Sequence, residues 1–253
     1  MFKRIKERLY FLKQWYVQVF CYPRENLILE ESLDYDAYWK EKLSSGRTEG
    51  LSRYEQKRAD IVLSFLQNEN EAEITVGDIA CGPGTILAYL ASKHRVLHGI
   101  CYDVSTYALT LAKEKGLETI NLDINVKKEV GKIIESDYFL LLEVLEHIPH
   151  SERLLNMVYL KARKGVFFSF PNSGYFSYRL RLLFGKMPAQ WRTFPNEHLR
   201  FWTLTDLRWW LKALGYQHYK IVPYQGVPIL NRIFPSLFSV GVLVYLSKSD
   251  SIL

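Results

Sequence analysis

Cysteine is scarce in this 253-residue sequence, which holds only Cys21, Cys81 and Cys101. Their odd number and the lack of a C-x-x-C pair argue against a disulfide framework and indicate reduced thiols. We therefore expect a cytoplasmic protein.

Long uncharged segments are also missing. None reaches the roughly 20 residues that a membrane-spanning helix needs. The N-terminal stretch MFKRIKERLYFLKQW is charged throughout, unlike a secretory signal peptide. The segment closest to a spanning helix, FPSLFSVGVLVYLS, is rich in β-branched residues and predicts a strand instead.

Neither internal repeats nor low-complexity segments interrupt the sequence. Hydrophobic residues make up 48% of it and charged residues 24%, which favours one sizeable core over a disordered chain. The net charge of +6 favours an acidic ligand, nucleic acid or an anionic membrane, and selects none of them.

Between residues 73 and 170, short apolar runs alternate with patterns typical of amphipathic helices. Strands separated by helices indicate right-handed βαβ units and a parallel sheet. The predicted strands are 73–80, 95–103, 118–124, 137–144 and 165–170, and the predicted helices are 85–93, 106–116, 127–134 and 151–162.

The alternation breaks after residue 173. A helix is predicted over 203–216, with Thr203 or Thr205 as its N-cap, and strands over 218–224 and 239–247 form an antiparallel pair. We therefore expect an α/β fold: a Rossmann-like, doubly wound, seven-stranded sheet, mostly parallel with an antiparallel last strand, and helices on both faces. The predicted domain organisation is a helical N-terminal extension (1–48) and one domain (49–253) with an insertion at about 174–203.

The stretch GDIACGPGTI, residues 77–86, places two glycines directly after a predicted strand. The dinucleotide fingerprint needs a third small residue where Leu87 stands, so it fits poorly. Read backward, the turn is D-x-A-x-G-x-G, and its glycines let the backbone run against a ligand. The candidate ligand-binding residues of this turn are Asp78, Ala80, Cys81, Gly82, Pro83 and Gly84.

Polar residues also follow the next three predicted strands, where an open parallel sheet binds its ligands. Asp103 lies 19 residues beyond Gly84, a spacing suited to gripping ribose hydroxyls, and Val104 follows it. Asp123 is placed to accept a hydrogen bond from an adenine amino group, with Ile124 beside the ring. Glu143 follows the fourth strand and is expected to face the cofactor.

These motifs resemble those of class I S-adenosylmethionine-dependent methyltransferases, whose first motif is D/E-x-G-x-G-x-G; Ala80 replaces the first glycine. The resemblance covers roughly residues 50–250. The stretches FFSFPNSGYFSYRLRLLFGKMP and PNEHLRFWTLTDLRWWLKALGY are similar to the MetW-like group. EVLEHI, in contrast, is common in small-molecule and sugar methyltransferases, and YDAYWKEK resembles enzymes of cell-surface glycan and secondary-metabolite clusters.

The resemblance implies S-adenosylmethionine as the cofactor and methyl transfer to a small-molecule or glycan acceptor at oxygen. The MetW-like stretches also allow a cofactor-binding partner of an acyltransferase that transfers no methyl group itself. We expect no nucleic-acid partner, because the N/D-P-P-Y/F element of exocyclic-amine methyltransferases is absent.

Two histidines are candidate catalytic bases for a hydroxyl acceptor, because an imidazole titrates near neutral pH. They are His147, after the fourth strand, and His198, in the segment that would cover the acceptor. The alternative is that each histidine orients a loop.

Glu143, Glu146 and His147 form E-x-x-E-H, similar to the metal-binding element of ubiquinone-biosynthesis O-methyltransferases. The other interpretation is that Glu143 faces the cofactor and Glu146 caps a turn, and we expect no metal.

Basic and aromatic side chains mix in two places. Residues 176–212 hold seven basic and two acidic residues, interleaved with Trp and Phe residues that include Trp209 and Trp210. This segment is either an acceptor lid or a helix packed on the sheet with solvated charges. Residues 1–20 predict an amphipathic helix that lies on the inner face of a membrane, on its own domain or on a partner helix.

Overall fold

The computed structural model describes residues 10, 12–13, 15–17, 19–21, 33–44, 50–67, 69, 71–94, 97–187 and 198–248. Two predicted segments are therefore covered only in part. Residues 1–9 of the N-terminal helix and residues 188–197 of the insertion lie outside the described residues.

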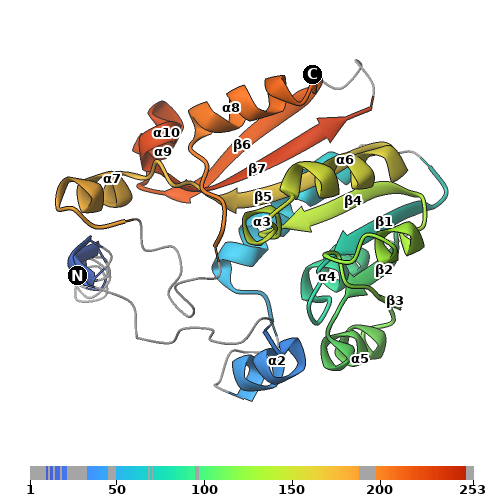
Figure 1. Cartoon of the computed structure of the whole chain (residues 1–253). Helices are drawn as coiled ribbons and strands as arrows, with labels where there is room; N and C mark the ends of the chain where they lie inside the picture. Colours follow the sequence, from blue (N-terminus) through green and yellow to red (C-terminus); the bar gives the residue numbers. More distant parts are fainter. Residues whose placement is uncertain are drawn as a thin grey trace.

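One seven-stranded sheet forms the centre of the molecule, in the order β3-β2-β1-β4-β5-β7-β6 (Figure 1). Strands β1 to β5 pair in parallel, and β7 runs antiparallel to both β5 and β6. The predicted fold class is thus confirmed, including the antiparallel final pair. The strands are β1 (Ile74–Ile79), β2 (Leu97–Asp103), β3 (Glu118–Asn121), β4 (Ser136–Leu142), β5 (Ala162–Pro171), β6 (Tyr219–Gly226) and β7 (Ser239–Ser247).

Helices cover both faces of the sheet because the buried strands carry apolar side chains on both sides. One core cluster packs the sheet against α6 (Ser151–Lys161) and α8 (Leu204–Ala213). The other packs it against α3 (Arg53–Leu66), α4 (Thr85–Lys93) and α5 (Thr106–Glu114). The remaining elements are α2 (Tyr35–Ser44), α7 (Phe176–Leu183), α9 (Leu230–Ile233), α10 (Pro235–Phe238) and the short 3-10 helices η1 (Glu129–Lys132) and η2 (Leu145–His147).

Helix α8 begins as the sequence predicts. Thr203, one of the two proposed N-caps, accepts a hydrogen bond from the backbone N–H of Asp206, and the Asp206 carboxylate accepts one from Thr203 N–H in return. The helix predicted over 127–134 is shorter, since only η1 forms there. Gly116 follows α5 with a φ of +82°, as expected of a helix-ending glycine.

Helix α2, in the N-terminal extension, is fixed to the domain by one carboxylate. Asp36 accepts hydrogen bonds from the hydroxyls of Ser105 (2.6 Å) and Thr106 (2.8 Å) and from the backbone N–H of Tyr107 (3.1 Å). These bonds hold the pKa of Asp36 below its usual value, with that from Ser105 contributing most. The carboxylate therefore ties α2 to the first turn of α5, where a helix favours negative charge.

Among the helices of the described residues, none combines the length and the hydrophobicity needed to cross a membrane.

Candidate active site

A cleft of about 470 Å³ lies at the carboxyl ends of the parallel strands. The sequence placed the cofactor here, and eight of the eleven predicted cofactor-binding residues line the cleft. They are Ala80, Cys81, Pro83, Asp103, Val104, Asp123, Ile124 and Glu143. The other three, Asp78, Gly82 and Gly84, are not among the lining residues.

The turn after β1 needs left-handed backbone conformations. Gly82 and Gly84 have φ values of +55° and +65°, and a Cβ on Gly84 would come within 2.7 Å of a Leu117 methyl carbon. Ala80, which stands for the first glycine of the motif, also has a positive φ of +56°. An alanine in this region stores backbone strain at the ligand-facing turn.

Asp103 holds this turn against the end of β2. Its carboxylate accepts hydrogen bonds from the backbone N–H groups of Gly82 (2.7 Å) and Ser105 (2.9 Å). Burial raises its pKa, and the amides that donate to it oppose part of that rise. The residue predicted to bind ribose thus also shapes the glycine turn.

Asp78 is 4% exposed and lies beneath the turn. Burial and the nearby carboxylate of Asp103 raise the pKa of Asp78 to about 8, against the opposing effect of Arg58. Near neutral pH this group is therefore largely protonated when no cation is bound.

Glu143 is paired with a cation that the sequence analysis missed. Its carboxylate lies 3.1 Å from a guanidinium nitrogen of Arg58 and accepts a hydrogen bond from Ser169 Oγ (3.0 Å). Burial is the largest single influence and lowers the pKa of the Arg58 guanidinium, but Glu143 together with Tyr224, Tyr54 and Glu55 outweighs it, so the pKa is raised. Nothing local in the sequence reveals this pair, because Arg58 lies on α3.

A second missed feature is the wall that α2 contributes. Tyr35, Tyr38, Trp39 and Lys42 all line the cleft. Trp39 packs directly on Gly82, where any Cβ would collide with the indole. In the sequence, the stretch YDAYWKEK indicated only a resemblance to other enzymes and predicted no role for any of its residues.

The two predicted catalytic histidines lie together. The rings of His147 and His198 are 4.6 Å apart and perpendicular. The backbone N–H groups of Leu199 and Arg200 donate to the Glu146 carbonyl oxygen at 2.8 and 3.0 Å, which holds the His198 segment against η2. His147 lines the cleft. Burial, and then His147, lower the pKa of His198 to about 3.

Most described basic residues of the 176–212 segment bind the protein's own backbone. Arg181, 1% exposed, donates to the carbonyl oxygens of Val19 and Cys21. Lys186 donates to Phe20 O, and Arg200 to Pro149 O. These contacts support a structural role for these cations over an anion-binding lid; Arg192 lies outside the described residues.

The neighbouring tryptophans of α8 differ in role. Trp210 is buried and its indole N–H donates to Glu152 at 3.0 Å, as expected for a residue that packs the helix on the sheet. Trp209 is 70% exposed, so it does not share that packing role.

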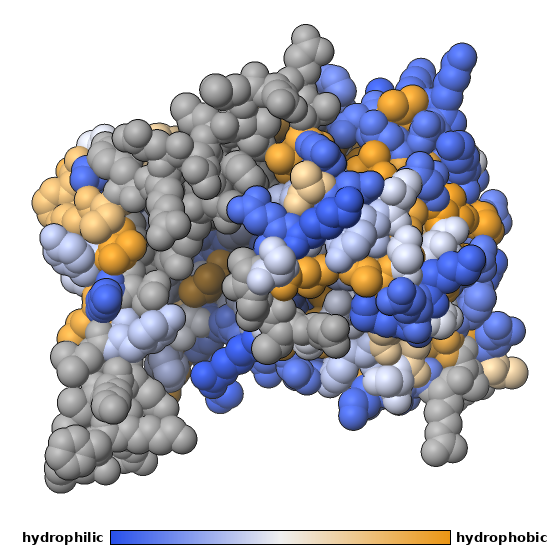
Figure 2. Space-filling model, turned by 90° about the horizontal axis from the view of Figure 1, so that it is seen from below, coloured by the Kyte–Doolittle hydropathy of each residue, from blue (hydrophilic) through white to orange (hydrophobic). Residues whose placement is uncertain are grey.

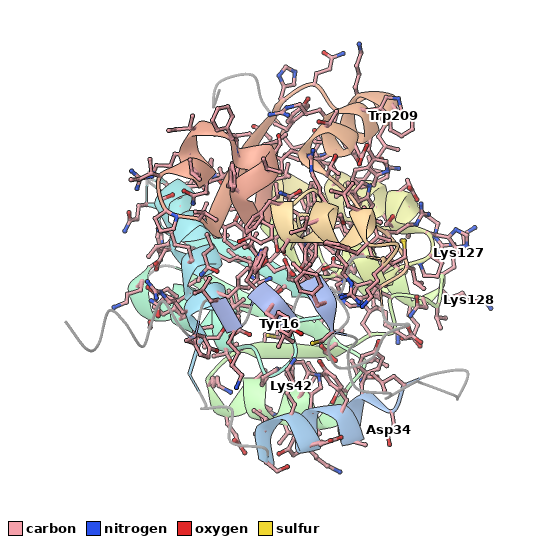
Figure 3. The ribbon with its side chains drawn as sticks, turned by 90° about the vertical axis from the view of Figure 1, so that its left-hand side faces the viewer. Tyr16, Asp34, Lys42, Lys127, Lys128 and Trp209 are labelled. Carbon is pink, nitrogen blue, oxygen red and sulfur yellow. The ribbon has the colours of Figure 1, made fainter. Side chains whose placement is uncertain are left out.

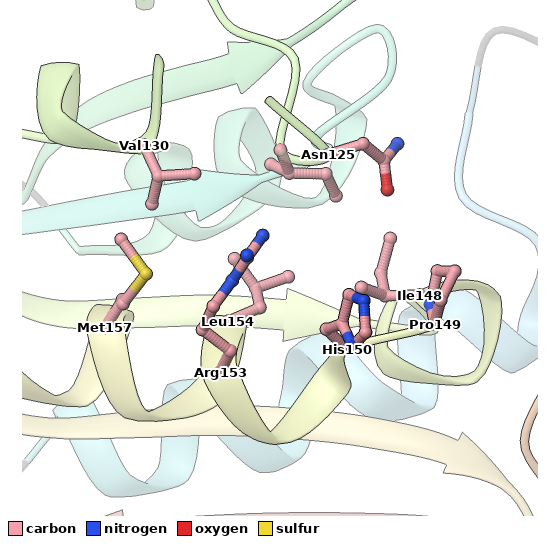
Figure 4. A pocket seen from close by; sticks show the side chains of 9 residues that line it. Asn125, Val130, Ile148, Pro149, His150, Arg153, Leu154 and Met157 are labelled. Atoms are coloured by element: carbon pink, nitrogen blue, oxygen red, sulfur yellow. The ribbon is translucent and has the colours of Figure 1, made fainter. Parts of the chain in front are cut away.

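A smaller cavity of about 200 Å³ lies beside the cleft, between η1 and the start of α6 (Figure 4). Ile124, Asn125 and Ile148 line both cavities and so separate them. No predicted catalytic residue lines the smaller one.

A family model described as a methyltransferase domain matches residues 51–221, two thirds of the chain. The chain belongs to the methyltransferase-domain family. No curated protein matches its sequence. The cofactor of this methyltransferase is S-adenosylmethionine, and structures similar to it hold SAM or SAH.

Solved structures share its fold at low sequence identity. Magnesium protoporphyrin IX methyltransferase from Synechocystis PCC 6803 is 16% identical with a TM-score of 0.58, covering 85% of this chain and 96% of that one. The methyltransferase domain of bacterial CtHen1 is 19% identical with a TM-score of 0.54, covering 76% and 98%. A SAM-dependent methyltransferase from Archaeoglobus fulgidus is 16% identical with a TM-score of 0.52, covering 77% and 98%.

Removing Arg58 should destabilise this methyltransferase. In Arg58→Met, Glu143 loses its partner in a largely buried site, so the free energy of unfolding should fall by about 3 kcal/mol. Arg53→Met, at an exposed position of the same helix, should change it by less than about 0.5 kcal/mol. Urea denaturation of the ligand-free protein measures both, and equal losses would contradict the buried-pair interpretation.

The raised pKa of Asp78 predicts a pH-dependent stability. The folded state keeps this proton up to about pH 8 while the unfolded chain releases it near 3.8, so the free energy of unfolding falls as pH rises between these values. Asp78→Asn removes this titration and should flatten the slope, leaving the smaller contribution of Asp103 in the same direction. Thermal denaturation from pH 5 to about 8 tests this; an unchanged slope in the variant would disprove it.

Proposed function

We propose that the protein transfers the methyl group of S-adenosylmethionine to a hydroxyl of a small-molecule or glycan acceptor. The observation that carries this proposal is that His147 lines the same cleft as the predicted cofactor-binding residues. The reaction forms the new C–O bond, breaks the S–CH3 bond and releases the hydroxyl proton. A methyl transfer to oxygen therefore needs a group that takes up this proton.

His147 is the proposed proton acceptor and His198 its positioning residue. A base whose conjugate acid has a pKa of about 3, as for His198, accepts a proton poorly near neutral pH. Its ring, 4.6 Å away and perpendicular, instead restricts how the imidazole of His147 can turn.

The wall that α2 contributes supports the acceptor class. Tyr38 and Trp39 present aromatic faces, which suit sugar rings, and the Lys42 ammonium lies 4.3 Å from the Trp39 ring centroid. A cation at this position suits an acidic acceptor. The similar solved structures include a magnesium protoporphyrin methyltransferase and a carbon methyltransferase, so the fold by itself selects no acceptor.

Two substitutions separate cofactor binding from turnover. Asp103→Ala should abolish calorimetric binding of S-adenosylmethionine, because it removes the predicted ribose ligand and an anchor of the glycine turn. His147→Gln should keep cofactor binding while kcat on acidic sugar acceptors falls about 100-fold or more.

The rival proposal, a MetW-like partner of an acyltransferase, makes a different prediction for the wild-type chain. A partner protein of this kind would bind the cofactor with the same dependence on Asp103 but would yield no methylated product from any acceptor pool. If the wild type turns over and His147→Gln turns over equally fast, the protein is an enzyme but His147 is not its base.

One observation favours a second mode of hydroxyl activation. Glu146, His147 and His198 offer ligand atoms that lie within 4.8 Å of one another. One carboxylate and two imidazoles suit a divalent transition metal, and such an ion lowers the pKa of a bound hydroxyl. The pairing of Glu143 with Arg58 leaves Glu143 outside this set, unlike the E-x-x-E-H interpretation of the sequence.

Metal removal distinguishes the two modes. In the metal mode, the purified chain retains about one divalent ion, chelation lowers kcat about 100-fold or more, and Glu146→Gln loses the ion. In the base mode, elemental analysis finds no stoichiometric metal and chelation leaves kcat unchanged. Cofactor binding, measured in parallel, shows that each sample remains folded.

A further inference from the structure

Large apolar side chains are exposed at the end of α7 and at both ends of α9. Leu183 and Ile229 are 81% and 72% exposed, far more than a core-forming residue tolerates. We call this set of residues the apolar end. Its members are Leu182, Leu183, Phe184, Met187, Ile229, Ile233 and Phe234.

The two parts of the apolar end are joined in the fold. Phe176 of α7 packs on Phe238 of α10 with ring centroids 5.7 Å apart, and the Asn172 amide donates to Ser236 O at 3.2 Å. Figure 1 shows α7, α9 and α10 at one end of the molecule, and hydrophobic residues appear at that end in the view from below (Figure 2).

The N-terminal helical residues extend this surface. Arg181 bonds to the backbone at Val19 and Cys21, and Phe20 packs on Phe184 at 5.2 Å, so the segment lies against α7. Its own apolar side chains remain exposed, with Tyr16 in front in Figure 3. They are Tyr10 (66%), Leu12 (57%), Tyr16 (57%) and Val17 (41%).

The charge around the apolar end has one sign. The described residues within segments 10–21, 172–187 and 223–241 include five basic residues, Lys13, Arg179, Arg181, Lys186 and Arg232, and no acidic residue. Lys13, Arg179 and Arg232 are exposed among the described residues of these segments. Exposed apolar side chains in segments that carry exposed cations and no described acid match an anionic surface that also accepts hydrocarbon.

We propose that the apolar end docks on an anionic lipid bilayer. The other occupant to consider is a second copy of the chain. A two-fold interface would bring two copies of this surface together, and the repulsion between the cations that both copies carry opposes such a pairing. Anionic headgroups attract these cations while the acyl region accepts the leucine, isoleucine and phenylalanine side chains.

The apolar end lies toward the carboxyl ends of β4 and β5, as the cleft does. In Figure 1 the arrowheads of β4 and β5 point toward α7 and the N-terminal segment. His147 follows the end of β4, and α7 follows the end of β5. Docking there would hold the cleft near the bilayer surface, where an acceptor carried on a lipid can reach it. The docking itself does not depend on the proposed function.

Vesicle flotation of the full chain tests the proposal without turnover. Binding is expected to phosphatidylcholine vesicles that contain about a third phosphatidylglycerol, and should weaken with salt and on pure phosphatidylcholine. The double variant Leu183→Glu/Ile229→Glu should lose binding at least about tenfold. The control variant Leu160→Glu/Trp209→Glu changes residues that are 67% and 70% exposed elsewhere, and should bind like the wild type.

Three results would overturn the proposal. They are absence of flotation with both vesicle types, equal loss in both double variants, and self-association of the wild type that Leu183→Glu/Ile229→Glu abolishes. Calorimetric binding of S-adenosylmethionine by every variant verifies folding, so loss of flotation cannot be mistaken for unfolding.

Discussion

The hydrogen bond from the Gly82 backbone N–H to the Asp103 carboxylate connects the parts on which the cleft depends. It joins the glycine turn after β1 to the end of β2. The same carboxylate accepts from Ser105 N–H, and Ser105 Oγ both caps α5 and donates to Asp36 of α2. One buried acid thus positions the glycine turn and the start of α5, and through Ser105 it also positions the wall that α2 contributes to the cleft. Its position at a strand end follows directly from the parallel sheet.

Several carboxylates are gathered around the cleft. Asp78 and Asp103 are both buried, each with a pKa above its usual value, and Glu143 is balanced by Arg58. Burying several carboxyl groups close together disfavours their charged forms, and a positively charged ligand that binds there favours those forms again. S-adenosylmethionine carries a sulfonium and an ammonium group, so its charge matches this site. The negatively charged pyrophosphate of a dinucleotide would instead be repelled by these carboxylates.

The strands and most helices could be predicted from the sequence because they depend on local patterns, and eight of the eleven predicted cofactor residues line the cleft. Alternating runs indicate strands, and in parallel strands the residues that follow them meet at one edge. The sequence could not predict the side chains that pair with these residues in the folded protein. Arg58 meets Glu143, and Asp36 meets Ser105, across sequence separations of 85 and 69 residues, where periodicity carries no information. The E-x-x-E-H stretch shows the difference, because only the fold assigns Glu143 to Arg58 and brings His198 beside His147.

The same contrast separates two parts of the structure around the cleft. The sheet and its turns carry the predicted cofactor-binding residues, and their geometry is set by glycine conformations and buried acids that few substitutions would preserve. The elements that reach past the strand ends are different. Helix α2, the His198 segment and α7 are each held by a few bonds, such as those of Asp36, Glu146 O and Arg181. These anchors preserve the position of a segment while leaving its outward side chains free to change. Substitutions in these segments can therefore change the surroundings of the cleft without disturbing the glycine turn or Asp103.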